Sequence, residues 1–156
     1  MTLYWLVKLI HILSGAVLFG TGMGIAFFMV WANRSRDAST IAPVARIVVV
    51  ADMIFTATAV VVQPLSGLWL IQIQGYSLSE PWLVAAYGLY AITGLFWLPV
   101  VWIQVRLARL AEEAASQGTR LSATYGRLYR IWFAMGFPAF VAVIGIYGLM
   151  VARPVF

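Results

Sequence analysis

Four apolar segments of membrane-spanning length dominate this sequence. They cover residues 3–31, 47–73, 82–105 and 131–151. Each exceeds the roughly 20 residues that an α-helix needs to cross about 30 Å of hydrocarbon. Because lipid offers the backbone no hydrogen-bond partner, segments of this kind must be helical. The sequence therefore predicts an all-α fold, a polytopic membrane bundle of four helices.

The composition excludes an ordinary soluble domain. Hydrophobic residues make up 63% of the chain and charged residues only 10%, whereas about a quarter of a typical soluble domain is charged. The length of 156 residues and the short connections predict a single domain over residues 1–156. The first segment has no basic region ahead of a short apolar core, so we do not expect a cleavable signal peptide.

Basic residues gather at two of the three connections. The first and third connections carry Arg34, Arg36, Arg46, Arg106, Arg109, Arg120, Arg127 and Arg130. The second connection carries Glu80 and no basic residue. The positive-inside rule therefore predicts that the first and third connections lie in the cytoplasm and both termini outside, and the net charge of +5 requires no nucleic-acid partner.

Local signals predict the helix ends and the membrane interfaces. Ser39 or Thr40 is expected to start the second helix, and S-E-P at 79–81 to start the third, which continues to about Gly118. Tryptophans near the segment ends are expected at the two interfaces. These are Trp5, Trp69 and Trp82 on the outer side, and Trp31, Trp102 and Trp132 on the inner side.

The only histidine, His11, lies inside the first apolar segment. It shares a helix face with Gly15 and Gly22, which leave room for another helix or a flat ligand. Three interpretations stay open: a hydrogen bond to a neighbouring helix, axial ligation of haem or another metal, or proton transfer. Lys8 either snorkels to the surface or pairs with an acidic group such as a haem propionate.

The second segment carries a polar stripe. Asp52, Thr56, Gln63 and Gly67 fall on one side of a regular helix. Asp52 is expected to form a salt bridge or to relay protons. The candidate cations for that salt bridge are Arg106, Arg127 and Arg130.

Gln63 and Trp97 lie at mid-membrane depth. Gln63 precedes Pro64, which frees a carbonyl and permits a kink, and its side chain can bond His11 or a ligand. Trp97 packs either inside the bundle or against a ligand ring. A lone histidine cannot supply both axial ligands of a haem. The second ligand would come from a partner copy, from Met23 or Met53, or from a lysine, or the position would stay open.

Much familiar chemistry is excluded. The chain has no cysteine, no HExxH motif, no phosphate-binding glycine loop and no paired carboxylates within a span.

The four segments resemble the DUF2269 family of bacterial inner-membrane proteins over nearly the whole chain, which implies an inner-membrane location with both termini in the periplasm. The matching stretches are K-L-I-H-I-L-S-G-A-V-L-F-G-T-G-M-G, A-D-M-I-F-T, V-V-V-Q-P-L-S-G-L-W-L, W-L-P-V-V-W-I-Q-V-R and R-I-W-F-A-M-G-F-P-A-F. A looser resemblance links W-L-V-K-L-I-H-I to membrane proteins of the HemJ and CopD types. The resemblance to HemJ-type proteins implies a haem b ligand at His11.

We therefore expect a haem-b-binding, cytochrome-like redox protein, an electron carrier or oxidoreductase that works as a homodimer with a redox partner. His11 would be the axial ligand, with Gly15 and Gly22 making room and Lys8 near a propionate. Gln63 and Trp97 would line the pocket. One alternative is a non-catalytic module that binds a lipid, a quinone or a partner protein along the polar stripe. The other is a small proton-coupled carrier that depends on Asp52.

Overall fold

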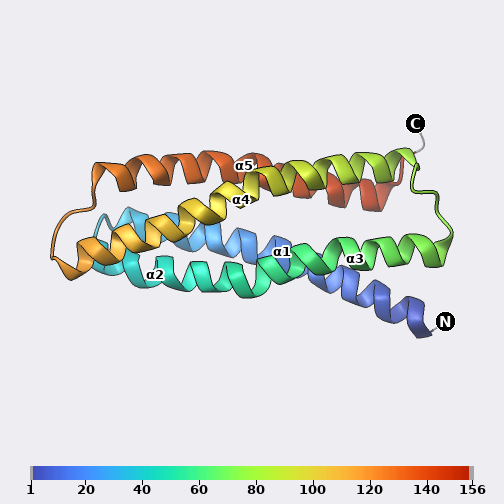
Figure 1. The fold of residues 1–156 in the computed structure, drawn as a ribbon, viewed down its shortest axis with the longest axis horizontal. Coiled ribbons are helices and arrows are strands. Elements are labelled where there is room, and N and C mark those ends of the chain that lie inside the picture. Colours follow the sequence, from blue (N-terminus) through green and yellow to red (C-terminus); the bar gives the residue numbers. More distant parts are fainter. Residues whose placement is uncertain (1, 155–156) are drawn as a thin grey trace.

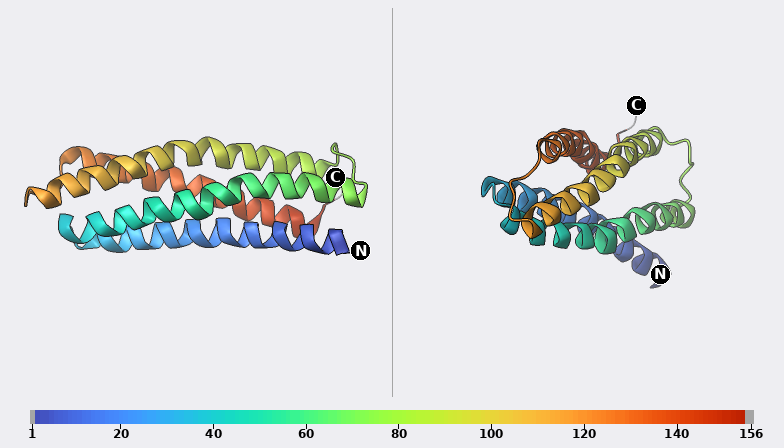
Figure 2. Two further views of the ribbon diagram at one scale, coloured as in Figure 1. Left: turned by 60° about the horizontal axis from the view of Figure 1, so that its bottom comes forward. Right: turned by 60° about the vertical axis from the view of Figure 1, so that its left-hand side comes forward.

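A computed structural model, which describes residues 2–154, confirms the all-α membrane bundle. Four long helical rods run side by side with alternating direction (Figures 1 and 2). They are α1 (Thr2–Arg34), a continuous rod made of α2 (Ala38–Ala51), the π-helix η1 (Asp52–Thr56) and α3 (Ala57–Gln74), then α4 (Pro81–Ser116) and α5 (Ala123–Ala152). All four rods are long and apolar enough to cross a membrane.

The second rod begins earlier than predicted, because its cap is Asp37. The Asp37 carboxylate accepts hydrogen bonds from the backbone N–H groups of Ser39 and Thr40, which are among the unpaired donors of a first helical turn. The prediction of Ser39 or Thr40 as the first capping residue was therefore wrong by two to three positions. The third rod begins at Pro81 and ends just before Gly118, as its sequence signals predicted.

The tightest packing lies in the half of the bundle next to the arginine-rich connections. There α2 contacts both α1 and α4, and Met29, Ile41 and Leu107 are fully buried. Alanines fill the spaces between these larger side chains, at Ala32, Ala42, Ala45, Ala108 and Ala111. Small residues let helix backbones approach closely, which is how helices associate in lipid without a hydrophobic driving force.

The opposite half of the bundle is looser. α3 packs along α1, whereas its backbone stays apart from α4 and α5. Pro64 has no N–H, so the carbonyl of Val60 lacks its helical donor. The Tyr90 hydroxyl of α4 donates to that carbonyl and ties the two helices together at this level. A cavity remains between them on the side of the chain termini.

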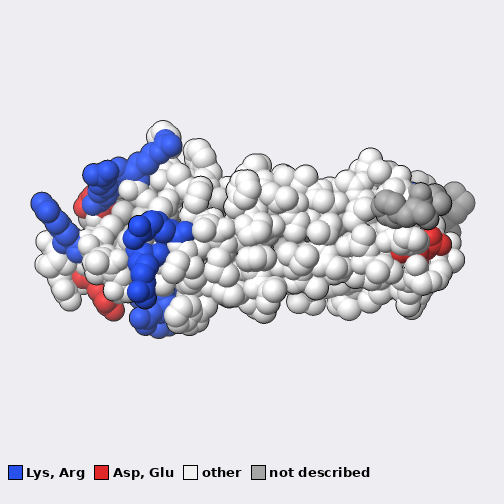
Figure 3. All heavy atoms as spheres, turned by 90° about the horizontal axis from the view of Figure 1, so that it is seen from above, with Lys and Arg blue, Asp and Glu red and all other residues white. Residues whose placement is uncertain are grey.

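Basic side chains gather at one end of the molecule (Figure 3). Four of the predicted interface tryptophans are exposed, namely Trp5, Trp31, Trp69 and Trp102. The other two are buried within the bundle. Trp82 is buried against Ile71 and Leu83, and Trp132 is buried with its N–H bonded to Gln104.

Asp37 gives the first connection a pH dependence. Hydrogen bonds from Ser39 and then Thr40 hold the pKa of Asp37 below its usual value of 3.8. A lowered folded-state pKa stabilises the fold above the unfolded value, and the stabilisation is lost as the pH falls through the folded value. We expect Asp37→Ala to lower the thermal midpoint by a few degrees near pH 7.

Circular dichroism melts in detergent test this expectation. The difference between the wild type and Asp37→Ala should narrow once the pH drops below 3.8. Asp37→Asn, which caps without titrating, is the matched control and should keep a constant difference from Asp37→Ala. A wild-type advantage that persists unchanged to about pH 2 would contradict the expectation.

Candidate functional site

Two reciprocal polar pairs join α1 to α3. His11 Nδ1 lies 2.9 Å from Ser66 Oγ, and the Ser14 hydroxyl donates to the Gln63 carboxamide oxygen. Both pairs hold the same antiparallel register. Sequence reasoning selected His11 and Gln63 but missed the two serines, although each serine follows one of those residues by three positions and so shares its helix face.

Glycines allow this close approach. A Cβ atom at Gly67 would lie only 3.2 Å from His11 Cε1, and one at Gly15 would lie 3.0 Å from the Tyr147 hydroxyl and 3.1 Å from Gln63 Nε2. The imidazole therefore lies against the backbone of α3. The space expected beside Gly15 for a ligand is filled by Tyr147 and Gln63, so Gly15 serves helix packing in this structure.

The hydrogen bonds select one tautomer of His11. The Ser66 hydroxyl has one proton to donate. Ser66 Oγ lies 2.7 Å from the carbonyl oxygen of Val62, and the carbonyl four residues earlier is the usual acceptor for a serine inside a helix. Ser66 Oγ then accepts from His11, so Nδ1 carries the imidazole proton. Nε2 keeps its lone pair and has no hydrogen-bond partner among residues 2–154. Nε2 of His11 is therefore the atom of this site that is available to bind a metal.

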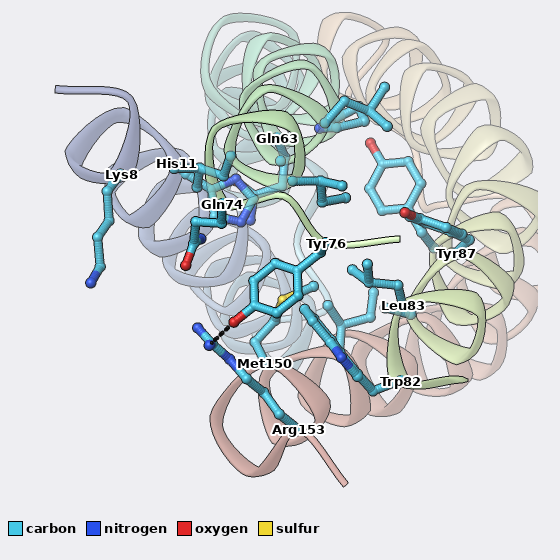
Figure 4. A pocket seen from close by; sticks show the side chains of 18 of the residues that line it. Lys8, His11, Gln63, Gln74, Tyr76, Trp82, Leu83, Tyr87, Met150 and Arg153 are labelled. Atoms are coloured by element: carbon cyan, nitrogen blue, oxygen red, sulfur yellow. Dashed lines mark hydrogen bonds between the residues drawn. The ribbon is translucent and has the colours of Figure 1, made fainter. Parts of the chain in front are cut away.

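His11 borders a cavity of about 330 Å³, which we call the histidine cavity (Figure 4). Its walls come from α1, α3, α4 and the end of α5, and most of the lining is apolar. The polar or ligating members of the lining are Tyr4, Lys8, His11, Gln63, Gln74, Tyr76, Trp82, Tyr87, Tyr90, Met150 and Arg153. The volume lies within the range of small-molecule sites.

Arg153 and Tyr76 border the histidine cavity near the chain termini. The Arg153 guanidinium donates to the Tyr76 hydroxyl at 2.7 Å and lies 5.7 Å from the Trp82 ring centroid. Lys8 borders the same cavity, but its ammonium group is directed away from it in Figure 4 and lies 5.4 Å from the ring of Tyr4. Arg153 is therefore the cation best placed for an acidic group on a ligand.

Other predicted residues line a second cavity of about 590 Å³, between α1, η1, α4 and α5. We call it the aspartate cavity. Its lining includes Asp52, Thr56, Trp97 and Gly22. Trp97 and Gly22 therefore do not meet His11. Met23 also borders this second cavity, so it does not face the imidazole either.

Asp52 makes no ion pair among residues 2–154, so the expected salt bridge to Arg106, Arg127 or Arg130 is absent there. Its buried carboxylate accepts a long hydrogen bond of 3.5 Å from Gln104 Nε2 instead. The Gln104 oxygen in turn accepts from the Trp132 N–H at 3.1 Å. The sequence places Gln104 on the same helix face as Trp97, but Gln104 was not among the predicted site residues.

The π-helix explains why the predicted stripe divides between two cavities. A π-helix takes one more residue per turn than an α-helix, so η1 rotates everything after it relative to a regular helix. Asp52 and Thr56 consequently face the aspartate cavity, while Gln63 and Gly67 face α1 and the histidine cavity. Single-turn π-helices of this kind occur frequently at functional sites.

A bare metal ion has few ligands in this protein. Residues 2–154 contain no group of three or more His, Cys, Asp or Glu side chains. A structural or catalytic zinc site needs at least three protein ligands. Haem differs, because the macrocycle supplies four nitrogen ligands and the protein adds only axial ones. His11 Nε2 can therefore serve as an axial ligand of haem, but it cannot hold a zinc ion without two further protein ligands.

The imidazole tautomer is directly measurable, since the chain has one histidine. We expect ¹⁵N NMR of the ligand-free protein to show a protonated Nδ1 and an unprotonated Nε2. Ser66→Ala removes the acceptor and should lower the population of this tautomer. Ser79→Ala, in the exposed α3–α4 connection, is the control and should leave it unchanged. A protonated Nε2 in the wild type would contradict the assignment.

Comparison with known proteins agrees with this architecture without adding a function. No curated protein and no solved structure matches the chain. Residues 5–154 match the family described as predicted integral membrane protein (DUF2269). Since the match covers nearly all of the sequence, the chain belongs to the DUF2269 family of integral membrane proteins.

Proposed function

We propose that this protein is a haem-b-binding, cytochrome-like redox protein with His11 as an axial ligand. The observation that carries the proposal is the His11 imidazole at the border of the histidine cavity, where Ser66 holds Nδ1 and leaves Nε2 without a hydrogen-bond partner among residues 2–154. Haem-ligating histidines use a neutral imidazole whose second nitrogen donates to a neighbouring group, which orients the ring and raises its basicity.

The other residues of the histidine cavity suit a haem. Arg153 would hold a propionate near the chain termini, and Tyr90, Trp82 and the apolar wall would contact the macrocycle. Met150 is the methionine that borders this cavity, so it replaces Met23 and Met53 as the candidate second axial ligand. A bound haem would supply one-electron transfer, and the surrounding chain would set its potential through the axial ligands and burial.

The revised pocket differs from the sequence-based one. Gln63 remains in it, and Lys8 contributes only its aliphatic stem, while Gly22 and Trp97 belong to the aspartate cavity. A porphyrin with its propionates is larger than the histidine cavity, so part of the ring needs cover from outside the chain. This favours the homodimer, in which a second copy covers the ring or adds its own His11.

The haem proposal is tested by absorption spectra of detergent-purified protein from haem-replete cells. The wild type should show a Soret band and, after dithionite reduction, an α band. His11→Ala should abolish or shift both bands, and added imidazole should restore part of the signal. Ser66→Ala should weaken haem retention about 10- to 100-fold, the usual cost of losing the group that orients a ligand.

Met150→Leu and Lys8→Gln complete the series. Met150→Leu should shift the reduced spectrum, whereas Lys8→Gln is a control because its ammonium group lies outside the cavity. Colourless wild-type protein that also takes up no haem on reconstitution would refute the proposal.

We also propose that the protein lies in a bacterial inner membrane with both termini in the periplasm. The support is the charge distribution, with eight arginines at or near the first and third connections and none in the second. In that orientation the histidine cavity opens toward the periplasm, where a redox partner would exchange electrons with the haem.

The orientation can be mapped with single cysteines, because the chain has none of its own. A membrane-impermeant maleimide should label Ser79→Cys, in the second connection, in intact spheroplasts. Gln117→Cys, in the third connection, should react only after lysis. Both residues are exposed, so the pair is matched for access. The reverse pattern would mean that the termini face the cytoplasm.

A further inference from the structure

The aspartate cavity has unused hydrogen-bonding groups. Thr56 is only 5% exposed and Asp52 only 4%. The Thr56 hydroxyl and the Trp97 N–H are buried and have no hydrogen-bond partner among residues 2–154. Buried polar groups in proteins are nearly always paired, and those within a membrane most of all. Two unpaired donors that face one cavity from two different helices therefore indicate a ligand.

The donors determine what kind of ligand would fit. Trp97 can only donate, and Gln104 uses its oxygen to accept from the Trp132 N–H and its amide Nε2 to donate to Asp52. A ligand must therefore present acceptor oxygens.

The rest of the cavity is apolar and aromatic. Phe133, Phe137 and Phe140 of α5 line it together with the rings of Trp97 and Trp132. Rings of this kind pack favourably against a flat conjugated ligand. At about 590 Å³ the cavity is large enough for a substituted ring and the start of a hydrocarbon tail.

The cavity also has a route to the lipid. It lies between α1 and α5, two helices that make little contact with each other. Their main aromatic contact is the stack of Phe19 on Phe140, with ring centroids 4.9 Å apart. Exposed side chains such as Phe27 and Phe137 belong to the lining, so the cavity opens toward the surrounding hydrocarbon.

We propose that the aspartate cavity binds the head group of an isoprenoid quinone. A quinone combines the required features: a flat ring, carbonyl oxygens that only accept, and an apolar tail that reaches the site through lipid. Thr56 and Trp97 donate to one carbonyl oxygen, and the Asp52 carboxyl lies beside that oxygen. This site is separate from the histidine cavity and does not require haem.

The binding of decylubiquinone to detergent-purified, full-length protein tests the proposal. Isothermal titration calorimetry, with protein-free micelles as the blank, should detect binding to the wild type. Thr56→Val keeps the shape of the side chain and removes its hydroxyl donor, and Trp97→Phe keeps an aromatic ring and removes the indole N–H. Each should weaken binding about three- to tenfold, the effect of one neutral hydrogen bond.

Matched controls lie on the same helical rods. Thr58 bonds the carbonyl of Ile54 and is exposed, and Trp102 is 61% exposed. Thr58→Val and Trp102→Phe should therefore leave the affinity for decylubiquinone unchanged. Equal affinity in all four variants would overturn the proposal, as would the absence of decylubiquinone binding to the wild type.

Two further measurements separate this site from its rivals. Binding of tetraphenylphosphonium that is lost in Asp52→Asn, without binding of decylubiquinone, would make the cavity a cation site and overturn the quinone proposal. His11→Ala should bind decylubiquinone with wild-type affinity. A chain that binds the quinone but never haem would thus refute only the function proposed for His11, and the reverse result would refute only the quinone site.

Discussion

The structure depends on one constraint, that a polar group in hydrocarbon must find its partner within the protein. The carbonyl left free by Pro64 receives the Tyr90 hydroxyl, and Ser14 and Ser66 pair with Gln63 and His11. These bonds fix the register of α1 on α3 and the distance from α3 to α4. Each of these three hydrogen bonds is weak individually, but nothing in the lipid competes for its donor or acceptor. The few atoms that escape this pairing consequently identify the places where a ligand is expected.

Helix packing is tight in one half of the molecule and looser in the other. Alanines bring α2 against α1 and α4 beside the arginine-rich end, and larger side chains such as Met29 and Leu107 fill the remaining space. Toward the termini the interhelical contacts are made by a few aromatic and polar side chains instead. The histidine cavity lies in this looser half, whereas the aspartate cavity lies beside α5 in the tightly packed half.

The sequence was sufficient to predict the four helices. It was not sufficient to predict how each helix is rotated about its axis, and so which side chains face each cavity. Length and apolarity predicted four spans, and the arginines predicted which connections share one end of the molecule. The π-helix at Asp52–Thr56 could not be predicted, because tertiary contacts rather than local propensity stabilise an extra residue in a turn. Treating residues 47–73 as a regular helix therefore joined Asp52 and Gln63 in one stripe that the structure divides. His11 and Gln63 were found because a polar residue within an apolar run is conspicuous, whereas serines are too common in membrane helices to stand out.

The same π-helix also sets the rotation of α3 relative to α2 within the second rod. If η1 relaxed to an ordinary α-helix, the segment on one side would turn by about 100° against the other, the angle between neighbouring residues of an α-helix. The polar pairs to α1 oppose that rotation on the α3 side, and the alanine packing opposes it on the α2 side. The second rod is thus held at one twist, and this twist sets which of its side chains border the aspartate cavity and which border the histidine cavity.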